Sequence, residues 1–150
     1  MNTGLQLKLL RKQHRYTQEE AAKILGISVR SISNYENNKT PLPISVMIKM
    51  AALYDFDVFT VFGVHDSSLV YDVPVYYYFK VHFEYIVRRE RDNDIRFGNV
   101  LPEEYYDERL RSYITEYIND PIFIKNYPDA AEVAREDGIY NTPSSMRFQE

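Results

Sequence analysis

Apolar and polar side chains recur with helical spacing along the first 63 residues. Leucines on one face, with basic residues opposite, predict a first helix that ends near residues 14–15. The leucines expected to face inward are Leu5, Leu9 and Leu10, and the residues expected to face outward are Lys8, Arg11 and Lys12. Thr17 and Glu20 then stand at the spacing of a capping box, which predicts a second helix from Gln18 to about Leu25.

A tight turn is predicted between the second helix and a third. Gly26 supplies the backbone freedom that the turn needs, and Ser28 is a good N-cap for a helix that runs to about Asn37. The residues expected to face inward are Ala22, Ile27, Ile32 and Tyr35. The third helix shows solvent a row of small and polar side chains, namely Ser28, Arg30, Ser31, Ser33 and Asn34. This pattern is typical of an element that lies in the major groove of DNA.

Two further helices are predicted before Gly63. Pro41 and Pro43 mark a rigid connection after the third helix. An apolar stripe predicts a fourth helix, with Ile44, Met47, Ile48, Ala51, Ala52 and Tyr54. Asp57 is expected to cap a short fifth helix that faces inward with Val58, Val61 and Phe62. Five helices in about 60 residues indicate a compact all-α domain.

The segment after a predicted linker at 64–74 fits two patterns. Aromatic and β-branched residues that alternate with polar ones favour a strand over 76–88. Lys80, Glu84 and Arg88 nevertheless fall on one face of a helix. Because seventeen residues, 75–91, are long for a strand, we predict a helix and keep a short β element at 76–88 as the open alternative.

The rest of the chain is expected to be helical with polar connections. Residues 91–99 are predicted to be a polar connection, and residues 102–118 an amphipathic helix with an acidic first turn. A last short helix is expected at 129–136, and residues 141–150 are expected to fray.

Charge is divided unevenly along the chain, whose net charge is -4. Residues 1–64 hold eight Lys and Arg against five acids, a net charge of +3, whereas residues 65–150 hold ten against seventeen, a net charge of -7. Phosphate binding depends on the local positive face and not on the total, so an acidic total does not exclude nucleic acid. Charge alone leaves open a mildly basic helical domain with no such partner.

Composition argues against several other classes of protein. The absence of cysteine excludes disulfides and thiolate metal sites and fits a reducing cytoplasm. Residues 1–13 lack a signal-peptide pattern, and no apolar run approaches the roughly 20 residues of a membrane span. His14, His65 and His82 stand at no metal-ligand spacing, and the glycines form no phosphate-binding loop. We therefore expect a cytoplasmic protein with no cofactor, no metal and no enzymatic activity.

Residues 5–63 resemble the Cro and phage-repressor type of helix-turn-helix domain, the XRE-like family. The resemblance is carried by TQEE at the start of the second helix, LGIS at the turn, SISNYEN in the third helix, and Lys39 followed by Pro41. It implies a mainly α protein with a five-helix lambda-repressor-like DNA-binding domain at 1–63. The linker at 64–74 and a tyrosine-rich, acidic dimerisation or effector region at 75–150 follow, and this tail resembles no family.

The resemblance also implies roles for individual side chains. The family's glutamine that contacts a phosphate and braces the recognition helix corresponds to Gln18, and Glu36 is expected to be structural. The implied DNA-binding set is Thr17, Gln18, Ser28, Val29, Arg30, Ser31, Ser33, Asn34, Asn37, Asn38 and Lys39. Arg30 can pair with guanine, Asn34 with adenine, and Val29 can contact a thymine methyl group. A phosphate contact for Arg30 and a solvated Asn34 remain alternatives.

Two positions depart from the family pattern, and neither argues against DNA binding. Ala21 replaces a larger apolar residue, and Asn38 replaces a glycine at a left-handed turn. We therefore predict a sequence-specific transcriptional regulator, a dimeric repressor that reads a palindromic operator in double-stranded DNA with helix 28–37. The alternative is an antitoxin or interaction module whose tail binds a partner protein or a small ligand while the head binds its own promoter.

Overall fold

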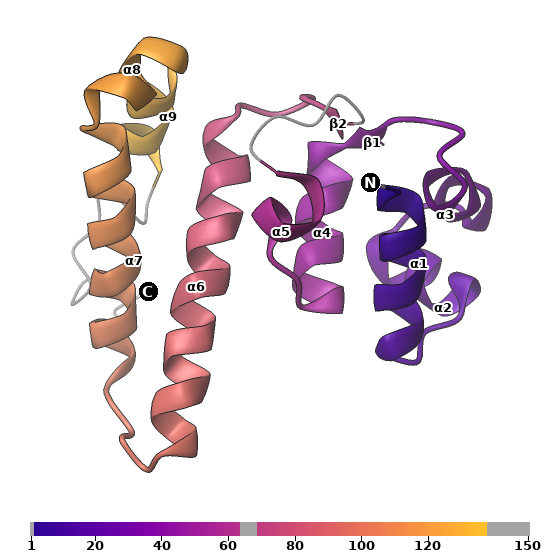
Figure 1. The fold of residues 1–150 in the computed structure, drawn as a ribbon, viewed down its shortest axis with the longest axis horizontal. Helices are drawn as coiled ribbons and strands as arrows, with labels where there is room; N and C mark the ends of the chain where they lie inside the picture. Colours follow the sequence, from indigo (N-terminus) through magenta and orange to yellow (C-terminus); the bar gives the residue numbers. More distant parts are fainter. Residues whose placement is uncertain (1, 64–68, 138–150) are drawn as a thin grey trace. The chain divides into compact units, whose positions relative to one another are not determined.

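Helices dominate the part of the chain that the computed structural model describes, residues 2–63 and 69–137 (Figure 1). The chain divides between residues 73 and 74 into two units, each with its own internal contacts. The predictions for 64–68 within the linker, and for 138–150 including the frayed end, lie outside the described residues. The mainly α prediction is confirmed. Among the described helices, none has the length and apolarity that crossing a membrane requires.

The first unit holds the five predicted helices. They are α1 (Thr3–Gln13), α2 (Gln18–Leu25), α3 (Val29–Glu36), α4 (Ile44–Tyr54) and α5 (Val58–Phe62). The capping box is complete, because the Glu20 amide donates to Thr17 Oγ1 at 3.0 Å and the Thr17 amide donates to Glu20 Oε1 at 3.2 Å. Gly26 closes α2 with a φ of 72°, a left-handed conformation that suits glycine. Local sequence signals therefore set the boundaries of these helices.

A short parallel strand pair was not predicted. β1 (Leu42–Pro43) pairs with β2 (Leu69–Val70), so that Leu42 lies beside Leu69. Asp72 then accepts hydrogen bonds from the Ser45 amide, at 3.0 Å, and from the Ser45 hydroxyl. These bonds lower the pKa of Asp72 and serve the first turn of α4, where the N-cap Pro43 has no side-chain acceptor. Residues 69–73 of the predicted linker thus belong to the first unit.

The inward face of α1 differs from the prediction, which was wrong. Leu5 and Leu9 are about half exposed, at 48% and 52%, whereas Leu7 and Arg11 are buried. Gly4 is also buried, and a Cβ atom there would lie 2.4 Å from the Glu36 carbonyl oxygen. Close approach of α1 to the end of α3 therefore requires glycine at position 4.

Arg11 turns inward because Glu36 neutralises it. Arg11 Nε donates to Glu36 Oε2 at 2.7 Å and Arg11 Nη2 donates to Oε1 at 3.0 Å, while Nη1 donates to the Tyr16 carbonyl oxygen at 2.7 Å. The bond to Glu36 raises the pKa of Arg11. Gln18 Nε2 also donates to Glu36 Oε1, at 3.1 Å. This Arg11–Glu36 network joins α1, α2 and α3 in the core of the unit.

The second unit contains the helices α6 (Tyr76–Arg96), α7 (Glu103–Ile118), α8 (Pro121–Asn126) and α9 (Ala130–Glu136). The helix prediction at 75–91 is confirmed, and the β alternative at 76–88 is wrong. Aromatic residues favour strands in general, but Tyr76, Phe79, Phe83 and Val87 are buried at helical spacing along α6. The polar connection at 91–99 was placed too early, because α6 continues to Arg96.

Aromatic rings fill the space between α6 and α7, which lie side by side (Figure 1). Phe123 of α8 packs edge-on against Phe79 and Tyr117, with ring centroids 5.0 Å and 4.7 Å apart. Phe83 and Tyr117 lie 5.1 Å apart. Such edge-to-face contacts add to the stabilisation from burying the rings. The tyrosines of this unit therefore serve in part as its core.

The Arg11→Met substitution tests the Arg11–Glu36 network. It leaves the Glu36 carboxylate buried without its cation, so we expect the first unit to lose about 3–5 kcal/mol of unfolding free energy. Hydrogen exchange at the α1–α3 amides of the full chain measures this loss. Lys12→Met, at an exposed neighbour, is the control and should change the value by less than about 0.5 kcal/mol. Equal losses in the two variants would contradict a structural role for the pair.

Tyr54→Phe tests a buried hydroxyl that finds no hydrogen-bond partner in the described residues. Burial, assisted by Glu36, raises the pKa of Tyr54 to about 12. Removing an unpaired hydroxyl should leave stability at pH 7 unchanged or up to about 1 kcal/mol higher. The stabilisation that depends on the neutral phenol is complete below the unfolded pKa of about 10 and is lost as pH rises towards 12.

Urea unfolding of both proteins from pH 7 to pH 11, followed by circular dichroism, measures this difference. The wild-type midpoint should fall more steeply than that of Tyr54→Phe above pH 10. A Tyr54→Phe protein that is clearly less stable at pH 7 would show that the hydroxyl has a partner.

Candidate nucleic-acid interface

The start of α3 is fixed by two serine side chains from the predicted set. Ser28 Oγ accepts a hydrogen bond from the Ser31 amide at 3.0 Å, and the two hydroxyl oxygens lie 2.9 Å apart. Thr17 serves α2 in the same way. These three residues hold the ends of their helices, so their side-chain hydroxyls are already engaged within the protein.

Three residues that are predicted to contact bases have side chains that form no hydrogen bond to the described residues. Val29 and Arg30 are exposed in the first turn of α3, and Asn34 lies half-buried one turn later. Within residues 2–63 and 69–137, no ion pair or side-chain hydrogen bond is formed by Arg30 or Asn34. Positions 30 and 34 share one side of the helix, so both side chains can approach the same surface. This combination leaves a guanidinium and a carboxamide free to bind another molecule.

The acid of α3 does not neutralise this face. Glu36 is the acidic residue of α3, and it is buried against Arg11. No carboxylate of α3 therefore neutralises Arg30. An anionic ligand would require such an uncompensated positive charge.

Gln18, at the start of α2, is placed to brace α3. Its half-buried side chain donates to Glu36 Oε1 at 3.1 Å. The bracing contact implied for Gln18 is therefore present, whereas its phosphate contact stays a prediction. Arg11 was missed as a partner of Glu36. The signal available in the sequence was its helical spacing from Gly4 and Leu7.

The loop after α3 is tied to the rest of the unit by its two asparagines. Asn37 Nδ2 donates to the Ser33 carbonyl oxygen at 2.9 Å and to Ser33 Oγ at 3.3 Å. Asn38 takes a left-handed φ of 56°, and its Oδ1 accepts from the Gly4 amide at 3.1 Å. Its Nδ2 donates to Asn2 Oδ1 at 2.8 Å. These side chains position the loop, and Lys39 is left as its exposed cation.

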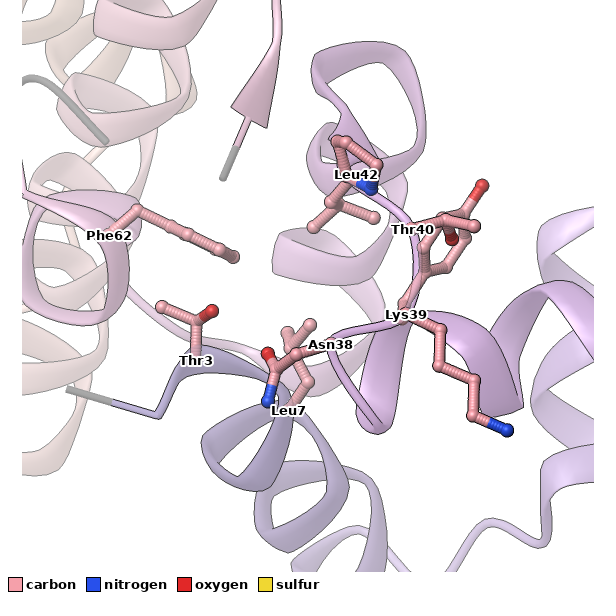
Figure 2. A pocket seen from close by; sticks show the side chains of 9 residues that line it. Thr3, Leu7, Asn38, Lys39, Thr40, Leu42 and Phe62 are labelled. Atoms are coloured by element: carbon pink, nitrogen blue, oxygen red, sulfur yellow. The ribbon is translucent and has the colours of Figure 1, made fainter. Parts of the chain in front are cut away.

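A cavity of about 310 Å³ lies beside this loop. Leu7, Tyr35, Pro41, Leu42 and Phe62 form its apolar lining, with Thr3, Asn38, Lys39 and Thr40 at its edge. Figure 2 shows that Phe62 reaches into the cavity whereas the Lys39 side chain points away from it. The Lys39 ammonium is therefore directed to the surface of the loop.

Metal binding finds no support in the described residues. No group of three or more histidine, aspartate or glutamate side chains in 2–63 and 69–137 is arranged to hold a metal ion.

Comparison with known proteins finds similarity within the first unit. Residues 7–59 match the family model described as helix-turn-helix. A Thermococcus gammatolerans protein, named provisionally as an HTH-type transcriptional regulatory protein, is 40% identical over 52 residues, which are 35% of this chain and 16% of that protein. The uncharacterized HTH-type transcriptional regulator YobD of Bacillus subtilis is 34% identical over 61 residues, 41% of this chain and 54% of YobD.

These matches cover less than two thirds of either relative. No solved structure matches the chain. The second unit is recognised by none of these comparisons.

Ser28→Ala tests whether Ser28 positions α3. Loss of the cap should cost about 1 kcal/mol and speed hydrogen exchange at the first amides of α3. The matched control is Ser33→Ala, because Ser33 Oγ accepts only a long 3.3 Å bond from Asn37. Ser28→Thr, which keeps an acceptor oxygen, should restore most of the protection. Faster exchange in Ser33→Ala than in Ser28→Ala would contradict the capping role.

Proposed function

Residues 7–59 form a helix-turn-helix domain, and from this premise we propose that the chain is a sequence-specific DNA-binding transcriptional regulator. The observation that carries the proposal is the outer face of α3, where Arg30 and Asn34 are free while Glu36 is buried. Helix-turn-helix domains read DNA with the N-terminal part of their second helix in the major groove. The names of the two relatives support the same role for this chain.

The base contacts follow from the chemistry of the side chains. Arg30 donates two hydrogen bonds to guanine O6 and N7, and Asn34 pairs with adenine N6 and N7. Val29, which is 38% exposed, contacts a thymine methyl group. Ser28, Ser31 and Ser33 keep the nearby surface small enough for the helix to approach the base edges.

Phosphate contacts set the position of α3 in the groove. Gln18 donates one Nε2 hydrogen to Glu36, and its second Nε2 hydrogen donates to one phosphate. Lys39 and the backbone of Asn37 and Asn38 contact the next part of the strand. Amides at the start of α2, beside Thr17, add donors that favour an anion. Because these contacts release counterions, affinity falls steeply as salt rises.

The regulator acts as a dimer and represses transcription by occluding a promoter. One recognition helix reads only a few base pairs. Two copies place two α3 helices in successive major grooves, about 34 Å apart, on a palindromic operator. The second unit, which lies outside the matched domain, supplies the contact between copies.

Arg30→Ala tests the proposal. We would select sites from a random DNA pool with the wild-type protein and measure affinities by gel shift at several salt concentrations. Arg30→Ala should lose about 1–3 kcal/mol on the selected site and accept other bases at one position. Lys39→Ala should weaken specific and non-specific binding alike and reduce the salt slope by about one.

Lys12→Ala removes an exposed lysine of α1 outside the DNA-binding set and serves as the charge control. It should leave both the affinity and the base preference unchanged. The absence of any sequence preference, or an affinity that survives Arg30→Ala combined with Gln18→Ala, would refute DNA reading by α3.

A further inference from the structure

The side chain of Asn38 ties the loop after α3 to the start of α1. Asn38 Oδ1 accepts a hydrogen bond from the Gly4 amide at 3.1 Å, and Asn38 Nδ2 donates to Asn2 Oδ1 at 2.8 Å. Asn2 Oδ1 also accepts from the Leu5 amide at 2.9 Å, so the same oxygen caps α1. We call the two hydrogen bonds of the Asn38 side chain, to Gly4 and to Asn2, the asparagine bridge.

The backbone at both ends of the asparagine bridge is fitted to it. Asn38 has a φ of 56°, a left-handed conformation that glycine adopts without cost and other residues do not. At the other end, a Cβ atom on Gly4 would lie 2.7 Å from Asn38 Oδ1. An asparagine therefore stands where the backbone alone would favour glycine, and its hydrogen bonds offset the cost of that conformation.

The asparagine bridge is the second attachment between α1 and the end of α3. The first is the Arg11–Glu36 network. Gly4 and Arg11 are seven residues apart, which places the two attachments about 10 Å apart along α1. A helix held at one point can pivot about it, whereas two points separated by two turns fix its direction. The bridge therefore fixes the loop relative to α1 as well as to α3.

Lys39, the exposed cation of the loop, directly follows the residue that forms the bridge. The Lys39 amide donates to the Asn34 carbonyl oxygen at 2.8 Å, and the Asn38 amide donates to the Tyr35 carbonyl oxygen at 3.2 Å. These backbone bonds close the loop on α3, so the loop keeps its turn without the bridge. The bridge adds a hold on a second helix. A lysine on a backbone fixed in this way loses less entropy when it binds a phosphate.

We infer that Asn38 is a positioning residue for the DNA contact of Lys39, and that it acts through Asn2 and Gly4. The inference rests on the proposed function and adds two residues outside the predicted DNA-binding set to its machinery. Both polar atoms of the Asn38 side chain are bonded within the protein. Its side chain therefore contributes to DNA binding through the neighbouring lysine.

Asn38→Gly tests the inference in the full chain, because glycine keeps the left-handed backbone and removes the asparagine bridge. Gel shifts would use the selected DNA site and an unrelated duplex. Affinity for both should fall about three- to tenfold, the cost of ordering one long side chain on binding. The base preference should not change. In the Asn38→Gly background, Lys39→Ala should weaken binding less than in the wild type, by a factor of about two or more.

Two further variants separate the bridge from the backbone change. Asn2→Ser keeps an acceptor for the Leu5 amide but is too short to reach Asn38, so it should reproduce the effect of Asn38→Gly. It also provides the test if Asn38→Gly fails to fold. The matched control is Asp55→Gly, because Asp55 has a left-handed φ of 49° and lies outside the DNA-binding set. Asp55→Gly should not weaken DNA binding.

Hydrogen exchange at the Gly4 amide measures the bridge without DNA. Exchange should be roughly tenfold faster in Asn38→Gly, because this amide loses its acceptor. The amides of residues 38–40 should also become more mobile in nuclear magnetic resonance relaxation, whereas those of α2 should not. Unchanged exchange at Gly4, or a DNA affinity that neither Asn38→Gly nor Asn2→Ser weakens, would overturn the inference.

The two kinds of measurement separate this inference from the proposed function. If the wild type prefers no DNA sequence, the proposed function fails, and faster exchange at Gly4 would still support the attachment of the loop to α1. If the wild type reads DNA but Lys39→Ala weakens binding equally with and without Asn38→Gly, the function stands and the positioning role of Asn38 is refuted.

Discussion

The buried pair between Arg11 and Glu36 decides where the outer face of α3 points. Two charges in the core carry a large desolvation cost, which is offset only when the geometry is good and the remaining donors are bonded. Here the pair is bidentate, and the Tyr16 carbonyl and the Gln18 carboxamide complete it. Such a pair fixes the positions of three helices relative to one another and does not add a large net free energy of unfolding. The same contact hides the acid of α3 from any anionic ligand.

Polar residues around α3 divide into two groups with different tasks. An eight-residue helix is too short to be stable alone in water, so it depends on its caps and its packing. Ser28, Asn37 and Asn38 use their side chains to hold its two ends. The side chains of Arg30 and Lys39 form no hydrogen bond or ion pair with the described residues and remain available. The face proposed to read DNA is therefore defined as much by which polar groups are already bonded as by which are exposed.

Local signals in the sequence predicted the first unit well, and long-range contacts account for what was missed. Caps at Thr17, Ser28 and Asp57 act within three residues, so their effect could be inferred directly. The burial of Arg11 depends on Glu36, 25 residues away in the sequence. Without knowledge of that partner, a charged residue is predicted to lie on the surface. The bonds that occupy the Asn38 side chain lead to Gly4 and Asn2, 34 and 36 residues away. The sequence therefore predicted which positions form the candidate site. It did not show which of their side chains are hydrogen-bonded within the protein and which are available to a ligand.

The second unit raises an electrostatic problem for association between copies. Residues 65–150 carry a net charge of -7, so two copies repel each other over most of this region. Association needs a place where apolar area is exposed and the local charge is balanced. Much of the apolar area of α6 and α7 is already buried among the rings of Phe79, Phe83 and Tyr117. Around the turn between α6 and α7, where Phe97 and Val100 are exposed, residues 91–107 hold two arginines against five acids, so the local charge is also negative.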